Sequence, residues 1–218
     1  MEGDELFDLI ARTRPVILEI LSDQGYNTAP YENQSPADVM KLAMGGPEPL
    51  RIRAEAKSGT TAATKRAQVF YWVFDKVKMS LDRRTDEAWD IENNPNAADP
   101  AQDEVIVIIN EPMHDVFHAM AIRQWSVQKR RISFFNIKQL IANPSRHVLQ
   151  PKFRKVPESE AGDVKRILHV KQHKNLPLIK FHVDIMTRVL GLVPDDVVEI
   201  IRPSPTSGEY RMYRICSV

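Results

Sequence analysis

The sequence predicts an α+β protein of two domains, an amino-terminal α/β domain over residues 1–143 and a small mixed α+β domain over residues 144–218. In the first part, strand-like and helix-like segments alternate as they do in an α/β layer. The last 43 residues are typical of a helix followed by a strand, a turn and a second strand. A chain of 218 residues can bury one large core or two modest ones, and Asn143-Pro144 separates the two patterns.

The first helix is predicted from an apolar face near the amino terminus. Its members recur at helical spacing: Leu6, Leu9, Ile10, Val16, Ile17, Ile20 and Leu21. Pro15 interrupts this pattern, because a proline inside a helix removes a hydrogen bond and costs about 3 kcal/mol. Two alternatives stay open: the helix is kinked at Pro15, or it begins there with the proline in its first turn.

Three segments follow the first helix. Residues 35–59 are rich in Pro, Gly, Ala and charge, which predicts a loop that carries one short helix, SPADVMKLAM. Gln68 to Phe74 is aromatic and β-branched, as a buried strand is. Residues 85–104 hold seven acidic residues and no basic one, so we expect a solvated loop there.

A strand, a helix and a second strand complete the α/β pattern. Val105 to Ile109 is apolar at every position, as in a strand that is covered on both faces. Pro112 is expected to open a helix, and Arg131 to Phe135 is expected to form the next strand. The apolar stripe of this helix consists of Met113, Val116, Phe117, Met120 and Ala121.

A basic stretch follows the domain boundary. Residues 146–180 contain nine Lys or Arg against three acidic residues. Such a surface can meet nucleic acid phosphates or an acidic patch on a partner protein. A solvated linker is the other interpretation, and charge alone does not choose between them.

The tail carries the densest pattern in the chain. Asp184 is a good helix N-cap, because its carboxylate can accept a bond from a first-turn amide. Gly191 stands where that helix is expected to end. Val197 to Ile201 predicts a strand that Pro203 ends. A turn at PSPTSG then leads into a second strand from Glu209 to Ile215.

The same tail contains an LPxI opening, an aspartate before a short helix, a GL pair, a VVxIIRPS strand, a TxGxY turn and a closing YR. These motifs fall on Leu176, Pro177, Ile179, Asp184, Gly191, Leu192, residues 197–204, Thr206, Gly208, Tyr210, Tyr213 and Arg214. Their order and spacing resemble the fifth shared subunit of eukaryotic RNA polymerases, whose carboxyl-terminal part is similar to a small subunit of the archaeal RNA polymerase. FNIKQLIANPSRHVLQPK at 135–152 resembles that family's interdomain segment, and RTRPVILEILSDQGY at 12–26 resembles its first helix.

The resemblance implies a noncatalytic subunit of a multisubunit DNA-directed RNA polymerase. It implies a nuclease-like jaw domain at 1–143, beside downstream duplex DNA, and an assembly domain at 144–218, packed on the largest subunit. The expected partners are therefore the largest polymerase subunit, other polymerase subunits and downstream DNA. We expect an intracellular protein, in the nucleus if it is cellular, or in the host cytoplasm or virion if a large DNA virus encodes it.

The resemblance also implies two sets of site residues. The DNA-proximal set consists of the family's proline-containing loop after a strand, here with Asn110 and Pro112, to which we add a basic cluster as a hypothesis from charge: Arg123, Lys129, Arg130 and Arg131. The subunit-interface set lies in the assembly domain: His147, Pro151, Leu176, Pro177, Arg202, Pro203, Thr206, Gly208, Tyr210, Tyr213 and Arg214. Glu111 and Asp115 would repel phosphates, so we expect DNA contact to be weaker than in relatives or to be carried by the basic cluster.

Composition excludes several classes of protein. Basic and acidic residues number 30 and 29, so the whole molecule has no bulk affinity for polyanions. The single cysteine, Cys216, excludes an internal disulfide and a Cys-rich zinc site. No apolar run approaches the ~20 residues that span a bilayer, and the acidic start is unlike a signal peptide. We therefore expect no membrane partner.

Motifs for chemistry are also missing from the sequence. There is no GxSxG nucleophile motif and no Gly-rich loop followed by GKS or GKT. His169 and His173 have no Cys, Asp or Glu close by and are better explained as solvated histidines. Glu111 and Asp115 lie near His114 and His118, but the apolar periodicity of that segment favours the polar side of an amphipathic helix. We expect no catalytic residue, no metal, no cofactor and no small-molecule substrate.

Departures from the family pattern concern the charge of the assembly domain. Glu199 stands where a lysine is common, and Asp195 and Asp196 stand where basic residues are common. The outward charge is thus expected to be partly reversed, as it would be in a divergent polymerase with a co-varied partner surface. Two rival hypotheses stay open: a magnesium-dependent nuclease that uses Asp75 and residues 76–78, and a free-standing transcription regulator.

Overall fold

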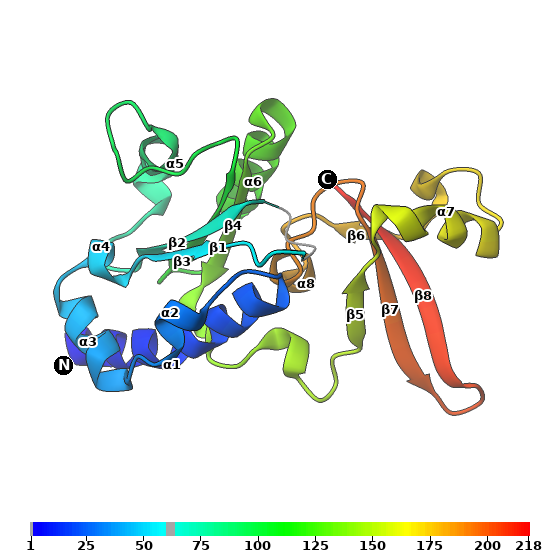
Figure 1. Cartoon of the computed structure of the whole chain (residues 1–218), viewed down its shortest axis with the longest axis horizontal. Helices are drawn as coiled ribbons and strands as arrows, with labels where there is room; N and C mark the ends of the chain where they lie inside the picture. The colour runs from blue at the N-terminus through cyan, green and yellow to red at the C-terminus, as the bar shows by residue number, and fades with distance from the viewer. Residues whose placement is uncertain (1, 60–63) are drawn as a thin grey trace. The chain divides into compact units, whose positions relative to one another are not determined.

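Two four-stranded sheets organise the chain, one in residues 1–143 (the first unit) and one in residues 144–218 (the second unit) (Figure 1). The structure is a computed structural model that describes residues 2–59 and 64–218, without the side chains of residues 2, 3 and 173. Both units combine helices with a sheet of mixed strand direction, which confirms the α+β class.

The sheet of the first unit has the strand order β1-β2-β3-β4. β1 (Ile52–Glu55) runs antiparallel to β2 (Arg66–Trp72). β2, β3 (Asp103–Ile109) and β4 (Arg131–Asn136) are parallel, and all seven residues of β3 are buried. A central parallel strand is buried in this way because helices cover both faces of the sheet.

The helices of the first unit lie on opposite faces of its sheet (Figure 1). They are α1 (Glu2–Asp23), α2 (Ala29–Glu32), α3 (Pro36–Met44), α4 (Pro47–Leu50), α5 (Leu81–Trp89) and α6 (Asp115–Gln128), with 3₁₀ turns η1 (Lys78–Ser80) and η2 (Ile137–Leu140). On one face, Phe117 of α6 packs on Phe134, with ring centroids 5.4 Å apart. On the other face, the Arg14 guanidinium of α1 lies 6.0 Å from the Tyr71 ring.

α1 continues through Pro15, so the alternative in which the helix begins at that proline is wrong. Pro15 has no N–H, and the carbonyl of Ala11 therefore lacks its usual helical donor. Two residues before Pro15, the Thr13 hydroxyl donates to the carbonyl oxygens of Leu9 (2.9 Å) and Ile10 (3.2 Å). Burial of the apolar face, with Ile10, Ile17, Ile20 and Leu21 fully inaccessible, holds the helix together across the interruption.

Two expected loops contain regular structure instead. Residues 35–59 include the expected helix, α3, whose Ser35 and Asp38 form a capping box, but they also include β1. Residues 85–104 are not one solvated loop, because Thr85 and Trp89 are buried in α5 and the segment ends inside β3. Acidic composition was misleading there, since Asp103 is buried and bonded rather than solvated.

α6 begins at Asp115, three residues after Pro112, so the expectation that the proline opens the helix is wrong. Pro112 is exposed in the loop that precedes the helix. The buried stripe consists of Phe117, Met120, Ala121 and Gln124, whereas Val116 is exposed. The stripe is therefore displaced toward the carboxyl end of the helix by about one turn.

The sheet of the second unit has the order β5-β7-β8-β6. Its strands are β5 (Lys152–Lys155), β6 (Leu178–Lys180), β7 (Val197–Ser204) and β8 (Gly208–Ser217), and β6 runs parallel to β8. The remaining elements are α7 (Glu158–Ile167), α8 (Ile185–Val189) and the 3₁₀ turns η3 (Pro144–Arg146) and η4 (His173–Asn175). A small core of buried side chains joins them: Val156, Val164, Leu176, Val197 and Ile215.

In the tail, the predicted helix is confirmed, and the predicted end of the first strand is wrong. Asp184 caps α8, because its carboxylate accepts a bond from the Met186 amide at 2.8 Å. Gly191 takes the expected left-handed conformation, with φ of 60°. Pro203 does not end β7; it lies inside the strand, opposite Glu209, where the neighbouring edge is free of other strands in the described chain.

The basic stretch after the boundary is folded rather than a solvated linker. It forms β5, α7 and β6, and Val156 and Val164 anchor it in the core. Arg154 and Lys155 are used in ion pairs with Glu199 and Asp196 at 2.8 and 2.7 Å. Part of the local excess of basic charge is thus neutralised within the unit.

Candidate functional site

The outer part of the β7–β8 hairpin is an exposed, two-stranded arm, which we call the hairpin arm and define as residues 202–210. Every residue in it except Ser204 is exposed. β5 pairs with β7 only up to Ile201, and β6 pairs with β8 only from Ile215 onward. In the described part of the chain, the arm therefore pairs only with itself. Two strands without a third strand or a covering helix are marginally stable in water, so such an arm suits a surface that a partner covers.

Five of the predicted interface residues gather on the hairpin arm: Arg202, Pro203, Thr206, Gly208 and Tyr210. Arg202 lies directly opposite Tyr210 in the ladder, and the Tyr210 side chain is 56% exposed. Gly208 has φ of 73°, and this left-handed conformation closes the turn. Tyrosine and arginine are the residues that most often anchor protein interfaces, so the arm has suitable chemistry for docking.

The other interface residues are placed differently. Tyr213 and Arg214 lie at the base of the arm, where the Tyr213 hydroxyl donates to Glu199 (2.9 Å) and Arg214 Nη1 donates to the Leu178 carbonyl (2.9 Å). His147 and Pro177 are exposed and Pro151 is half-buried. Leu176 is only 5% exposed and belongs to the core, so its side chain does not lie on the surface.

Glu199 is internal, which corrects the expectation that it reverses the outward charge. Its side chain is 3% exposed and accepts bonds from Arg154 Nε (2.8 Å) and the Tyr213 hydroxyl (2.9 Å). Arg211 Nη1 lies 3.7 Å away. Burial raises the pKa of Glu199, but the bonds from Arg154 and Tyr213 outweigh it and hold that pKa below the ordinary 4.5.

Asp196 is also turned inward. It accepts bonds from the Val193 amide (2.7 Å) and from Lys155 Nζ (2.7 Å), while Asp195 is exposed in the turn with φ of 77°. The acidic residues at 196 and 199 therefore stabilise the second unit. They give no reason to expect a reversed partner surface.

In the first unit, the loops that follow β2 and β3 meet where these parallel strands end. We call this surface the loop edge and define it as residues 74–80 and 110–114. The Glu111 carboxylate accepts a bond from the Lys78 amide at 3.1 Å and a shorter one from the Val77 amide. Asn136 Nδ2 donates to the Glu111 carbonyl at 2.6 Å. Glu111 thus ties the loops together, so its carboxylate is engaged rather than facing outward as a free charge.

Exposed residues cover this edge. Asn110 and Pro112 lie here as expected, together with Lys76, Lys78 and Met79, whose side chain is 94% exposed. From the sequence alone, Lys76 and Lys78 were candidates only for a nuclease site, and Met79 was not a candidate for any site. The sequence did contain a signal for an exposed contact surface, namely a large apolar residue close to two lysines and shortly after a buried strand.

The basic cluster does not lie on the loop edge. β4 begins at Arg131, opposite Glu104, and ends at Asn136, opposite Ile109. Five residues of strand separate these ends, or roughly 17 Å at the usual rise per residue. The cluster at 129–131 therefore lies at the far edge of the sheet from Asn110 and Pro112.

The basic side chains of the cluster also have partners of their own. Arg123 is paired with Asp82 at 2.5 Å. Lys129 Nζ lies 5.3 Å from the Trp125 ring, and the Arg130 guanidinium lies 5.5 Å from the Trp89 ring. The Arg131 guanidinium also lies near the Trp125 ring, 5.6 Å from its centre. Contacts to aromatic faces of this kind are stabilising but do not neutralise the charge.

The residues of the hypothetical nuclease do not form a metal site. The Asp75 carboxylate is bonded to Arg84 Nη2 at 2.7 Å. Across residues 2–59 and 64–218, no three His, Cys, Asp or Glu side chains are grouped in a way that could hold a metal ion. Cys216 is buried, and burial with nearby Asp196 raises the pKa of its thiol to about 12, so it is not a thiolate nucleophile at neutral pH.

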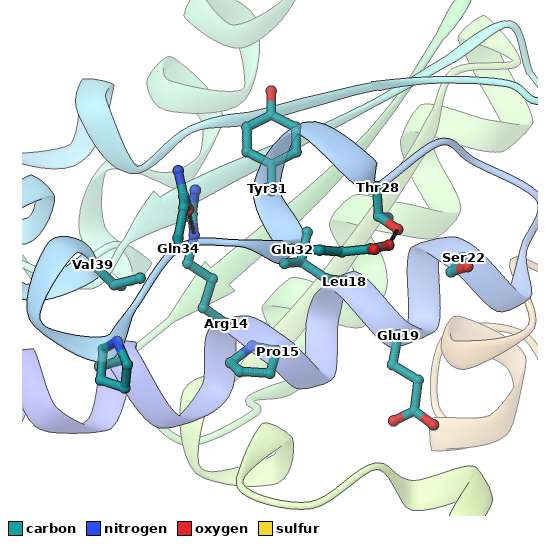
Figure 2. A pocket seen from close by; sticks show the side chains of 12 residues that line it. Arg14, Pro15, Leu18, Glu19, Ser22, Thr28, Tyr31, Glu32, Gln34 and Val39 are labelled. Atoms are coloured by element: carbon teal, nitrogen blue, oxygen red, sulfur yellow. Dashed lines mark hydrogen bonds between the residues drawn. The ribbon is translucent and has the colours of Figure 1, made fainter.

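A pocket of about 370 Å³ lies between α1 and the α2–α3 segment (Figure 2). The buried Arg14 reaches from α1 toward Gln34, to which it donates at 2.8 Å, and it also donates to the Leu50 carbonyl at 2.7 Å. At the other end, the Thr28 hydroxyl donates to Glu32 at 2.6 Å. The polar groups of Arg14 and Thr28 are thus bonded to the protein itself, and we assign this pocket a role in packing.

Comparison with known proteins identifies the second unit. The family model described as RNA polymerase Rpb5, C-terminal domain, matches residues 142–216. The DNA-directed RNA polymerase subunit Rpo5 of Thermococcus kodakarensis is 39% identical over 69 residues, which cover 32% of this chain and 82% of that protein. The chain belongs to the Rpb5/Rpo5 family of RNA polymerase subunits. The resemblance predicted from the tail is thereby confirmed.

The Rpb5 likeness also extends beyond the second unit. The Dictyostelium discoideum protein named DNA-directed RNA polymerases I, II, and III subunit rpabc1 is 24% identical over 208 residues, 95% of this chain and 96% of that protein. Rpo5 of Pyrococcus abyssi is 40% identical over 73 residues, 34% of this chain and 87% of that protein. These archaeal Rpo5 proteins thus match about a third of the chain, and the eukaryotic Rpb5 relative matches nearly all of it.

None of the helices in residues 2–59 and 64–218 combines the length and the hydropathy needed to cross a membrane. The candidate interaction surfaces of this Rpb5 family member are the loop edge of the first unit and the hairpin arm of the second unit.

Proposed function

We propose that the chain is a noncatalytic subunit of a multisubunit DNA-directed RNA polymerase. The match of the second unit to the Rpb5 C-terminal domain supports this function most strongly. The likeness of almost the whole chain to a subunit named for RNA polymerases I, II and III adds to it. In this role the chain binds other polymerase subunits and works mechanically, while nucleotide addition happens elsewhere in the complex.

Within that role, the second unit acts as an assembly domain that docks on the largest subunit through the hairpin arm. The arm offers Arg202 and Tyr210 side by side, on strands with no other neighbour in the described chain. The fixed φ angles of Pro203 and Pro205 restrict the backbone of the tip, which reduces the entropy lost on binding. Tyr213 and Arg214 hold the base of the arm rather than contact the partner.

The first unit acts as a jaw beside downstream DNA, and the loop edge carries its contact. Lys76 and Lys78 are exposed there, and Asp75 is paired with Arg84. Glu111 is bonded to two backbone amides, which reduces its repulsion toward phosphates. We therefore favour the loop edge over Arg123 and residues 129–131 as the DNA-proximal surface.

A double substitution tests the jaw proposal. Lys76→Glu with Lys78→Glu, in polymerase assembled with the variant chain, is expected to reduce crosslinking to downstream duplex DNA severalfold. The salt dependence of DNA binding should also become shallower, by about one unit of slope for each lost phosphate contact. Crosslinking yield and affinity at several salt concentrations are the measurements.

The matched control makes the same charge change at the opposite edge of the sheet, with Lys129→Glu and Arg130→Glu. The loop edge proposal expects this control to leave downstream crosslinking nearly unchanged. If the control abolishes crosslinking while the Lys76 and Lys78 variant does not, the basic cluster is the DNA-proximal surface and our choice is wrong.

Recovery of polymerase with the tagged intact chain tests the subunit function itself. Stoichiometric recovery of the two largest polymerase subunits supports the proposal, and their absence would favour a free-standing transcription regulator. The proposed role places the protein where its polymerase works, which is the nucleus for a cellular enzyme and the host cytoplasm or virion for a viral one.

A further inference from the structure

A second pocket of the first unit, of about 230 Å³, has the composition of an anion site. It lies between α4, α5 and β2, and Arg84 in its lining is paired with Asp75 of the loop edge. Its lining includes three arginines and three aromatic residues: Arg51, Arg83, Arg84, Phe70, Tyr71 and Trp72. Glu48 and Glu87 also line the pocket, so its cationic side chains outnumber its anionic ones by one.

Arg51 is the central residue of this pocket. Its side chain is only 4% exposed, and its guanidinium carbon stacks 4.0 Å from the centre of the Phe70 ring. Nη2 donates to the Gln68 side chain at 2.5 Å. Nε and Nη1 are buried and have no hydrogen-bond acceptor in the described part of the chain. A buried donor without an acceptor costs about 1–3 kcal/mol, and more for a charged group.

The charged groups around Arg51 do not supply a hydrogen-bond acceptor for its Nε and Nη1. The nearest carboxylate, that of Glu48, is 3.7 Å from Nη1, which is too long for a hydrogen bond, and its side chain is 63% exposed. Arg84 is matched by Asp75, and Arg83 is paired with Glu87 at 3.5 Å on the surface. Burial, with the nearby Arg53, lowers the pKa of Arg51 to about 10, and the nearby carboxylates of Glu48 and Asp103 offset only part of this shift.

We propose that this pocket binds a terminal phosphate, either inorganic phosphate or a small phosphate monoester. Nη1 of the buried Arg51 has no acceptor and faces the side from which Glu48 approaches, so it can donate to a phosphate oxygen there, while Arg83 and Arg84 line the same pocket. A bound phosphate takes the position near Nη1 that Glu48 approaches without bonding, and Glu48 moves into solvent. A terminal phosphate fits a pocket of this size with its free oxygens inward, whereas a phosphodiester carries a substituent on each side.

Titration of the intact chain with inorganic phosphate tests the proposal, with sodium chloride at equal ionic strength as the reference. Saturable binding by calorimetry, accompanied by a rise in the thermal midpoint, is expected. Phenyl phosphate should bind at least as tightly as inorganic phosphate, because its ring can contact the aromatic lining. Tighter binding of phenyl phosphate indicates an organic monoester as the natural ligand, and equal binding indicates free phosphate.

Two variants with the same side-chain change locate the site. Arg51→Met is expected to weaken phosphate binding at least tenfold. Arg53→Met is the control, because Arg53 lies two residues away on β1, is exposed, and its side chain bonds only to Asn96 at the surface in the described contacts. This control should bind phosphate like the natural chain. Equal loss in both variants would overturn the assignment to Arg51.

Glu48→Gln keeps the proposal testable even if Arg51→Met folds poorly. If Glu48 only competes for Arg51, its neutralisation should strengthen phosphate binding severalfold with little change in stability. If Glu48 is instead the structural partner of Arg51, the variant should lose stability and gain no phosphate affinity, and this result would overturn the proposal. Equal binding of dimethyl phosphate, or no saturable binding by the natural chain, would overturn it as well.

Discussion

Leu176→Ala is expected to lower the free energy of unfolding of the second unit by about 3 kcal/mol. Leu176 is 5% exposed and packs with Val156, Val164, Val197 and Ile215 in a small core. Truncating it removes transfer free energy and leaves a cavity that a core of so few side chains fills poorly. Urea unfolding of the intact chain, followed by hydrogen exchange in peptides from residues 152–218, measures the effect.

The matched control for this prediction is Leu178→Ala. Leu178 is the same residue type two positions along the chain, but its side chain is 55% exposed on β6. The expected change is at most about 0.5 kcal/mol. Losses of similar size in the two variants would show that the leucine at 176 is not the core residue we describe. Leu176 would then again be a candidate interface residue, as its place in the family motif predicts.

Asp103→Asn is expected to destabilise the first unit by about 3 kcal/mol. The carboxylate is fully buried and accepts bonds from Arg66 Nε (2.6 Å), from the Gln68 amide group and from the Asp99 backbone amide (2.8 Å). Asparagine has a similar shape but removes the charge and turns an NH₂ group toward these donors. Thermal or urea unfolding with exchange in peptides from β2 and β3 is the measurement.

Asp86→Asn provides the control for the Asp103 prediction. Asp86 undergoes the same chemical change on the exposed side of α5, so we expect a change within about 0.5 kcal/mol. If Asp103→Asn were as mild as this control, the buried network that links β2 to β3 would contribute nothing to stability. The pairing of Arg66 with Asp103 would then be incidental.

Local patterns predicted the elements whose burial depends on a simple repeat. β3 is apolar at five successive positions, from Val105 to Ile109, and is buried throughout. Asp184 and Gly191 were recognisable as the two ends of α8, because N-caps and left-handed glycines act within one helical turn. The Rpb5 motif itself lies in this part of the chain, which is why the family could be predicted from the tail.

The remaining elements depend on contacts that are distant in sequence. Glu199 reads as an outward acidic residue until β5 places Arg154 beside it, 45 positions earlier in the chain. β6 has only three residues, and its pairing with β8 spans 37 positions, from Ile179 to Cys216. No window of sequence contains both partners of such a pair, so neither strand type nor burial could be predicted there.

The candidate sites could be predicted only in part, because they also depend on contacts that are distant in sequence. The motif placed Arg202 and Tyr210 on one hairpin, and the structure puts them directly opposite each other. The DNA-proximal set joined Pro112 to the cluster at 129–131, although α6 carries the chain from one edge of the sheet to the other between them. The basic cluster could be predicted from its charge. The meeting of the loops at Glu111 could not, because it depends on the sheet topology.

Co-purification with a hairpin variant tests the central claim most directly. The tagged intact chain is expected to recover the two largest polymerase subunits in stoichiometric amounts, and a chain carrying Arg202→Ala and Tyr210→Ala is expected to recover at least tenfold less while remaining folded. Asp86→Asn serves as the folded control with full recovery. Equal recovery by the hairpin variant, or no polymerase subunit with the natural chain, would contradict the account.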